Sequence, residues 1–219
     1  MKTFTKIIIA SSIGLLSFQG EAQTIAIKGG VNFSKIANDD VFGGAESGFT
    51  TSFNPGFHVG ATVDLPITKM FSVETGLFAT TSGLKYKASF QDFGFVYDYR
   101  VAFNLLNAEI PVIFKSTFEV GENFNIYVGA GGYGAFSLFG TVKSRINIMG
   151  QVESDSEVID FNDLEDDRFD AGLRFDAGIE VKGFIVGASY NFGLAPTIFE
   201  GQNRIIKVSL GYRFGWNKA

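Results

Sequence analysis

Apolar and polar residues alternate along most of this chain, and the stretch from Ile205 to Trp216 shows the pattern most clearly. Its apolar face carries Ile206, Val208, Leu210, Tyr212, Phe214 and Trp216. Its other face carries Lys207, Ser209, Gly211, Arg213 and Gly215. A period of two residues is that of a β-strand. Strands of soluble proteins are usually shorter than this one, whereas a tilted strand that crosses a bilayer needs about 9 to 11 residues. The stretch therefore predicts a membrane-crossing strand.

Seven earlier stretches alternate in the same way. The full set is Ile25 to Ser34, Gly56 to Ile67, Phe71 to Thr81, Leu105 to Thr117, Phe124 to Phe139, Phe169 to Lys182, Phe184 to Leu194 and Ile205 to Trp216. Three connections are short, at Thr68 to Met70, Phe118 to Asn123 and Lys182 to Gly183. Four are longer and polar, at Ala37 to Pro55, Ala88 to Asn104, Gly140 to Arg168 and Ala195 to Arg204.

An even number of antiparallel strands with alternating short turns and long loops is typical of bacterial outer-membrane barrels. We therefore predict an all-β fold, an eight-stranded antiparallel up-and-down transmembrane β-barrel. Both termini are expected in the periplasm, and the four long loops are expected outside the cell.

Charged residues of the predicted strands fall on the face opposite to the apolar one. They are Lys28, Asp64, Glu74, Glu109, Lys115, Arg174, Asp176, Glu180, Lys182, Lys207 and Arg213. Alternation alone does not say which face points inward, so a water-soluble lipocalin-like barrel is the alternative. Such a barrel would have to pack some 25 Phe residues around a cavity that holds one small ligand. We expect the apolar face to contact lipid and the charged face to line the lumen.

Aromatic residues gather at both ends of the predicted strands. Beside the short turns or the C-terminus lie Phe71, Phe118, Phe124, Phe184 and Trp216, and beside the long loops lie Phe33, Phe57, Phe136, Phe169 and Phe192. Aromatic rings favour the membrane–water interface, where they form girdles around membrane barrels. The two groups are therefore predicted to be such girdles.

The N-terminal residues 1–22 are predicted to be a cleaved signal peptide, which leaves 23–219 as the barrel domain. Lys2 and Lys6 precede an apolar run, and Gly20-Glu21-Ala22 is a small-x-small cleavage site. The chain has 18 basic and 23 acidic residues. Cleavage would remove two basic residues and one acidic residue, which leaves the mature chain with a net charge of about −6. This acidic balance argues against nucleic acid as a partner. The absence of cysteine excludes disulfides and a lipid-anchored cysteine.

Three segments together resemble the porin-like, or PorT-like, outer-membrane β-barrel family. They are the opening Ile27-Lys28-Gly29-Gly30-Val31-Asn32-Phe33-Ser34, the segment Ala108-Glu109-Ile110-Pro111-Val112-Ile113-Phe114-Lys115, and the ending Gly211-Tyr212-Arg213-Phe214. The resemblance implies an eight-stranded barrel of the OmpX and OmpA plan over the mature chain, without implying a particular reaction. Outer-membrane barrels commonly end on an aromatic residue that the barrel-insertion machinery reads. Here Asn217-Lys218-Ala219 follow Trp216.

The lumen charges are expected to form a salt-bridge network. Eight strands enclose an interior that side chains can fill, and buried ions require partners. We expect Glu74, Glu109, Asp176 and Glu180 to face Lys28, Lys115, Arg174 and Arg213. Asp64 and Lys207 belong to the same face. The alternative is a passive small-ion pore.

Enzymatic or metal chemistry has two candidate locations. His58 is the only histidine, so a lipid-modifying enzyme of the Ser-His-acid type would have to use it. The segment Glu153 to Asp167 carries eight carboxylates, but their spacing does not match a calcium loop. We therefore expect no enzyme, cofactor or metal. The predicted role is structural or surface-interacting through the four long loops. Outer-membrane lipid and lipopolysaccharide, the insertion machinery and an extracellular ligand are the expected partners.

Overall fold

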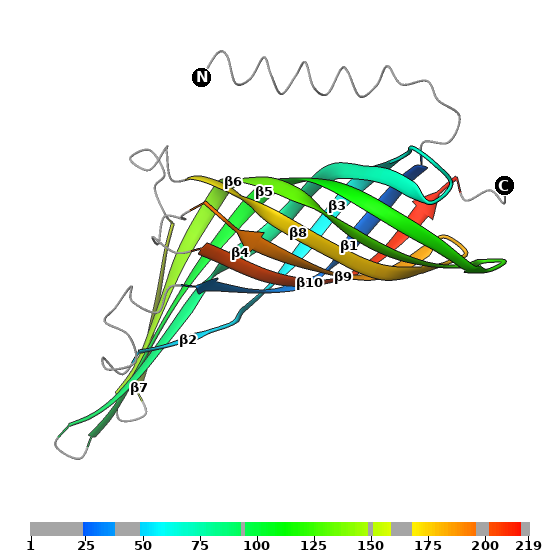
Figure 1. Cartoon of the computed structure of the whole chain (residues 1–219). Coiled ribbons are helices and arrows are strands. Elements are labelled where there is room, and N and C mark those ends of the chain that lie inside the picture. Colours follow the sequence, from blue (N-terminus) through cyan, green and yellow to red (C-terminus); the bar gives the residue numbers. More distant parts are fainter. Residues whose placement is uncertain are drawn as a thin grey trace, which may run out of the picture.

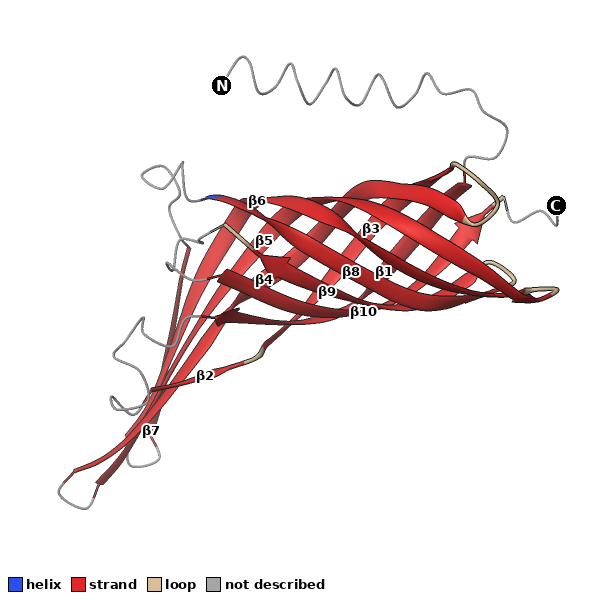
Figure 2. Ribbon diagram, viewed as in Figure 1, coloured by secondary structure: helices blue, strands red, loops and turns tan. Residues whose placement is uncertain are grey.

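The computed structural model describes residues 24–37, 49–92, 95–148, 151–158, 168–195 and 202–215. Figures 1 and 2 show these residues as a barrel of strands with a strand extension at one end. The strands are β1 (Thr24–Ala37), β2 (Phe49–Ser52), β3 (Asn54–Pro66), β4 (Phe71–Asp92), β5 (Phe95–Gly121), β6 (Phe124–Ile148), β7 (Gln151–Val158), β8 (Phe169–Val181), β9 (Phe184–Gly193) and β10 (Gln202–Phe214).

Eight of these strands close into a ring in the order β1, β3, β4, β5, β6, β8, β9 and β10. Every neighbouring pair is antiparallel, and β1 pairs with β10 from Ile25 opposite Phe214 to Ala37 opposite Gln202. A closed ring leaves no unpaired backbone edge, which is the condition for spanning a membrane with strands. The predicted eight-stranded antiparallel barrel is confirmed.

The apolar face of each ring strand points outward, and the polar face points into the lumen. On the outside, Val112 and Leu210 are 55% and 65% exposed, whereas on the inside Glu109 and Lys207 are each 1% exposed. A barrel dissolved in water has the opposite arrangement, because burying charge and exposing apolar surface both cost free energy there. The lipocalin-like alternative is therefore wrong, and the outer surface is suited to lipid.

The three short connections lie together at the end of the barrel where β1 begins and β10 ends (Figure 1). The tightest is the two-residue turn between β8 and β9, where Lys182 and Gly183 have φ angles of 51° and 85°. Positive φ at both central residues is the type I′ geometry, whose twist matches that of the flanking strands. Lys182, which sequence alternation assigned to the lumen face, is exposed in this turn instead.

The predicted long loops are largely strand, and this corrects the sequence-based layout. Residues 88–92 and 95–104 continue β4 and β5, and residues 140–148 continue β6. β2 lies within the connection predicted from Ala37 to Pro55, and β7 within the connection predicted from Gly140 to Arg168. At a rise of about 3.3 Å per residue, the 27 residues of β5 span about 90 Å, far more than one bilayer crossing requires.

Beyond the barrel rim these strands form one sheet, here called the extension. It comprises residues 85–92 of β4, 95–102 of β5 and 141–148 of β6, together with β2 and β7. The strand order is β2, β4, β5, β6, β7. In Figure 1 the extension projects from the end of the barrel opposite to the short turns.

Two inward aromatic side chains fill the lumen because glycine faces them on neighbouring strands. A Cβ atom built on Gly187 would lie 2.3 Å from the hydroxyl oxygen of Tyr127, and one built on Gly178 would lie 2.5 Å from it. A Cβ atom on Gly60 would similarly lie 2.5 Å from the Phe78 ring. Larger residues at these positions would force the rings off the barrel wall, and such glycine–aromatic pairing is a known feature of curved sheets.

Some predictions lie outside the described residues. These include the signal peptide of residues 1–22, the girdle residue Trp216, and the acidic positions 159–167. Among the residues that are described, no helix is long and apolar enough to cross a membrane.

Candidate functional site

The middle of the lumen is occupied by a central cluster of four ionised side chains, Glu109, Arg174, Asp176 and Lys207. The Lys207 ammonium donates to both oxygens of Glu109 at 2.6 Å. Arg174 donates through Nη1 to Glu109 at 2.9 Å and through Nε to Asp176 at 2.8 Å. The cluster holds two positive and two negative groups, so charge is balanced at this level.

A second group of ions, the turn-side cluster, lies nearer to the short turns. It consists of Lys28, Asp64, Glu74, Lys115, Glu180 and Arg213. The Glu74 carboxylate pairs with Lys28 at 2.5 Å and with Lys115 at 3.0 Å, and Lys115 also pairs with Asp64. Lys28 and Lys115 lie 5.9 and 5.7 Å from the centroid of the Tyr127 ring, whose face attracts cations. Three positive and three negative groups again balance.

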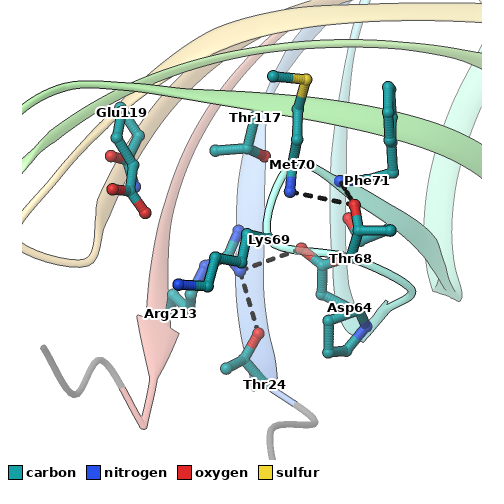
Figure 3. Close-up of a pocket in the computed structure, with 12 residues that line it drawn as sticks. Thr24, Asp64, Thr68, Lys69, Met70, Phe71, Thr117, Glu119 and Arg213 are labelled. Atoms are coloured by element: carbon teal, nitrogen blue, oxygen red, sulfur yellow. Dashed lines mark hydrogen bonds and ion pairs between the residues drawn. The ribbon is translucent and has the colours of Figure 1, made fainter. Parts of the chain in front are cut away.

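Arg213 closes the turn-side cluster at the barrel mouth (Figure 3). Its Nη1 donates to Thr24 and Asp64, each at 3.0 Å, and its Nε lies 2.7 Å from Glu180. Outside this residue the mouth is an open recess of 190 Å³ that is lined in part by the turn residues Lys69 and Met70. The recess therefore ends on a paired arginine.

The structure brings together all ten charged residues that sequence analysis singled out for the lumen network. Each takes part in at least one ion pair, and apart from Arg174 and Asp176, which are neighbours on β8, the partners lie on different strands. With Lys182 in a turn, the two clusters contain five basic and five acidic groups. Each of these ten charges therefore has a counter-charge inside the lumen, where the loss of hydration costs the most free energy.

Sequence analysis missed a further lumen carboxylate, Asp170. It accepts hydrogen bonds from the Tyr133 hydroxyl at 3.1 Å and from Asn203 Nδ2 at 2.8 Å. The signal was present, because Asp170 alternates in phase with Arg174 and Asp176 along β8.

The outer third of the lumen is closed by neutral groups. Asn107 donates to Ser82 at 2.7 Å and accepts from Ser137 at 2.9 Å, and Asn54 donates to Asn104 at 3.0 Å. Above them Leu84 and Tyr86 form a buried apolar cluster against Phe103. This layer lies where the barrel passes into the extension.

Side chains at the central level have almost no contact with solvent. Asn32, Thr80 and Asn191 are 0% exposed, and Glu109 and Lys207 are 1% exposed. A water-filled pore would leave the side chains that line it exposed. The geometry at this level is that of a filled interior.

His58 lies in the same layer and meets a partner that sequence analysis did not identify. Its Nε2 lies 2.8 Å from the Ser209 hydroxyl, 151 positions away in the sequence. His58 Nδ1 has no hydrogen-bond partner among the described groups, whereas a catalytic triad requires an acidic group at that position. Both residues are buried, with His58 2% exposed, so a lipid ester has no access to the serine.

The predicted girdle residues divide into exposed and half-buried ones. Seven of the girdle residues point outward and are exposed, namely Phe33, Phe57, Phe71, Phe118, Phe136, Phe169 and Phe184. Phe124 and Phe192 are half-buried, and the Arg204 guanidinium stacks 3.6 Å from the Phe192 ring centroid. Their role at the two membrane interfaces stays a prediction.

Of the acidic segment, Glu153, Asp155 and Glu157 are described, and they lie on β7. Alternate residues of a strand share a face, so these three carboxylates form one exposed row. Within the described part of the chain, no group of three His, Cys, Asp or Glu side chains is arranged to hold a metal ion.

Lipid-facing strands around a charged, filled lumen define an outer-membrane β-barrel protein. Residues 21–198 match the model of the outer membrane protein beta-barrel domain, and the chain belongs to this family. It is accordingly located in the bacterial outer membrane.

Solved structures of outer-membrane barrels are similar in fold. Ail from Yersinia pestis is 16% identical, with 89% of this chain and 100% of that chain covered and a TM-score of 0.37. Neisserial surface protein A is 12% identical, with 88% and 98% covered and a TM-score of 0.43. OprG from Pseudomonas aeruginosa is 12% identical, with 88% and 96% covered and a TM-score of 0.45. The comparison with curated proteins gave no match.

Replacing Glu109→Gln should destabilise the barrel by about 3 to 5 kcal/mol, because it leaves Lys207 buried without a counter-charge. The double variant Glu109→Gln/Lys207→Met should recover most of this loss, since Arg174 and Asp176 still neutralise each other. Urea unfolding in phospholipid vesicles, followed by circular dichroism, measures both. The exposed change Lys69→Met is the control and should have no effect. Strictly additive losses in the double variant would contradict the pairing.

Proposed function

We propose that the protein is a non-enzymatic outer-membrane barrel whose closed lumen serves only stability and whose extension makes contacts at the cell surface. The observation that carries the proposal is the pairing of ten lumen charges, eight of them buried, beneath an extension built on three barrel strands. A rigid wall that continues beyond the membrane holds a surface at a fixed position, and such surfaces are where recognition tends to occur.

The proposed surroundings follow from this arrangement. Outer-membrane lipid and lipopolysaccharide surround the barrel, and the insertion machinery recognises its last strand, β10. The extension, with the connections predicted at residues 37–55 and 140–168, carries the surface for an extracellular ligand.

The orientation has a direct test, because the chain contains no cysteine. A membrane-impermeant maleimide should label Ser156→Cys in the extension on intact cells. It should label Lys69→Cys, in the turn between β3 and β4, only after the outer membrane is permeabilised. Mass spectrometry of the purified variants measures the labelling. The reverse pattern would place the extension in the periplasm and refute the proposed role.

A passive small-ion pore is the alternative that sequence analysis left open. The near-complete burial of Glu109, Lys207 and their neighbours favours a closed lumen. In planar bilayers the natural protein should give no discrete conductance steps. Glu109→Ala/Lys207→Ala removes two long side chains while keeping the lumen neutral, and it should introduce steps. Reproducible steps in the natural protein would refute the closed lumen.

A lipid-modifying enzyme is the second alternative, and the contact between His58 and Ser209 is the observation in its favour. We expect no activity, because both groups are buried and His58 lacks an acidic partner among the described residues. Lipid A from cells that overproduce the natural protein, the variant His58→Ala/Ser209→Ala, or neither can be compared by mass spectrometry. The three acyl patterns should be identical. A change that depends on both residues would establish an enzyme.

A further inference from the structure

The extension separates its basic residues onto a single face. The register of β4, β5 and β6 places five basic residues on the same face of the sheet. They are Lys85 and Lys87 on β4, Arg100 on β5, and Lys143 and Arg145 on β6. Lys85 is half-buried and the other four are exposed. The carboxylate row on β7 lies on the opposite face, because Lys143 and Arg145 stand opposite Ser156 and Ser154.

Three of these residues form a ladder across the sheet. Lys87 stands directly opposite Arg100, and Arg100 stands directly opposite Arg145. Neighbouring strands lie about 4.8 Å apart, and like charges placed directly opposite each other destabilise a sheet. This arrangement costs stability, so a purely structural role does not account for it.

The ladder is not neutralised within the described part of the protein. The carboxylates of the described ion pairs all face the lumen, and none of them pairs with the five basic residues. The register places one acidic residue, Asp98, on the same face, which leaves four net positive charges. In the lumen, by contrast, both ion clusters are balanced. Among the described residues the basic face is therefore unbalanced, and its charge suits it to bind an anion.

The position of this face indicates where the anion comes from. The face continues the lipid-facing surface of the barrel, because Phe139 on β6 and Leu106 on β5 belong to it. Lys143 is four residues beyond Phe139 and Arg100 is six residues from Leu106. These separations correspond to about 13 and 20 Å along the strands, and to less along the membrane normal because the strands are tilted. The basic residues therefore stand just beyond the hydrocarbon layer, at and above the level of the headgroups. A ligand held in the membrane beside the barrel meets this face directly.

We propose that the basic face of the extension binds the phosphate-bearing headgroups of glycolipids in the surrounding outer leaflet. This inference deepens the proposed function, on which it rests, because it names the surface that the extension contacts. Lys85 and Lys143 flank the ladder one row nearer to the membrane, and Ser52, Ser154 and Ser156 border the two rows with hydroxyl groups. Cations placed among hydroxyl donors are suited to phosphate and sugar oxygens.

The test measures binding of the purified full chain in neutral detergent to purified lipopolysaccharide by microscale thermophoresis. Lys87→Gln/Lys143→Gln should weaken binding about 30-fold at low salt, as expected for about 1 kcal/mol per lysine near an anionic surface. The natural protein should lose affinity as salt is raised. The matched control, Lys69→Gln/Lys182→Gln, removes the same charge from two turns and should change the affinity less than twofold. Slower gel migration after boiling verifies that each variant is folded.

The outcomes separate the possible ligands. Unchanged affinity in Lys87→Gln/Lys143→Gln, or an equal loss in the turn control, would overturn the proposal. Tighter binding of soluble heparin than of lipopolysaccharide would assign the face to an extracellular polyanion and also overturn it. In either case, surface labelling of Ser156→Cys and absence of conductance would leave the broader proposed function standing.

Discussion

Pairing of ions inside a closed ring is the constraint on which this barrel depends. Lys28, Glu109, Lys207 and their partners lie where water does not reach, and an unpaired charge there would cost several kcal/mol. The barrel meets this requirement in two separate neutral clusters. The charged partners of Glu109 come from β8 and β10, so the strands must be in register across the lumen before the charges can balance. Pairing and closure therefore depend on each other.

Closure also explains why the outer surface can be so uniformly apolar. Once β1 pairs with β10, the ring has no open edge strand, so the backbone of the wall is paired within the sheet and its outer face can be apolar. Phenylalanine and branched aliphatic side chains can then fill it. Glycine at positions such as Gly178 and Gly187 serves the other side of the wall, where the Tyr127 ring needs room.

The continuation of β4, β5 and β6 beyond the rim gives the protein a second surface with different chemistry. On the same strands, the outward face is apolar at the level of the membrane and basic above it, as at Phe139 and Lys143. One unbroken sheet thus meets hydrocarbon first and polar headgroups next. Because β2 and β7 pair at its two sides, the extension is a sheet and not a flexible loop, which makes the spacing of its charges fixed.

The sequence by itself determined the positions of the eight ring strands at the level of the membrane, their two faces and ten of the lumen charges, because alternation is a local property that each strand carries alone. It also held the signals for Asp170 and for the extension, where aromatic and β-branched residues such as Tyr97, Tyr99 and Val101 favour strand over loop. Only the tertiary structure decided which charges pair. Lys207 and Glu109 are 98 positions apart, and His58 and Ser209 are 151 apart. Such contacts depend on the stagger of strands around the ring, and no local pattern encodes that stagger.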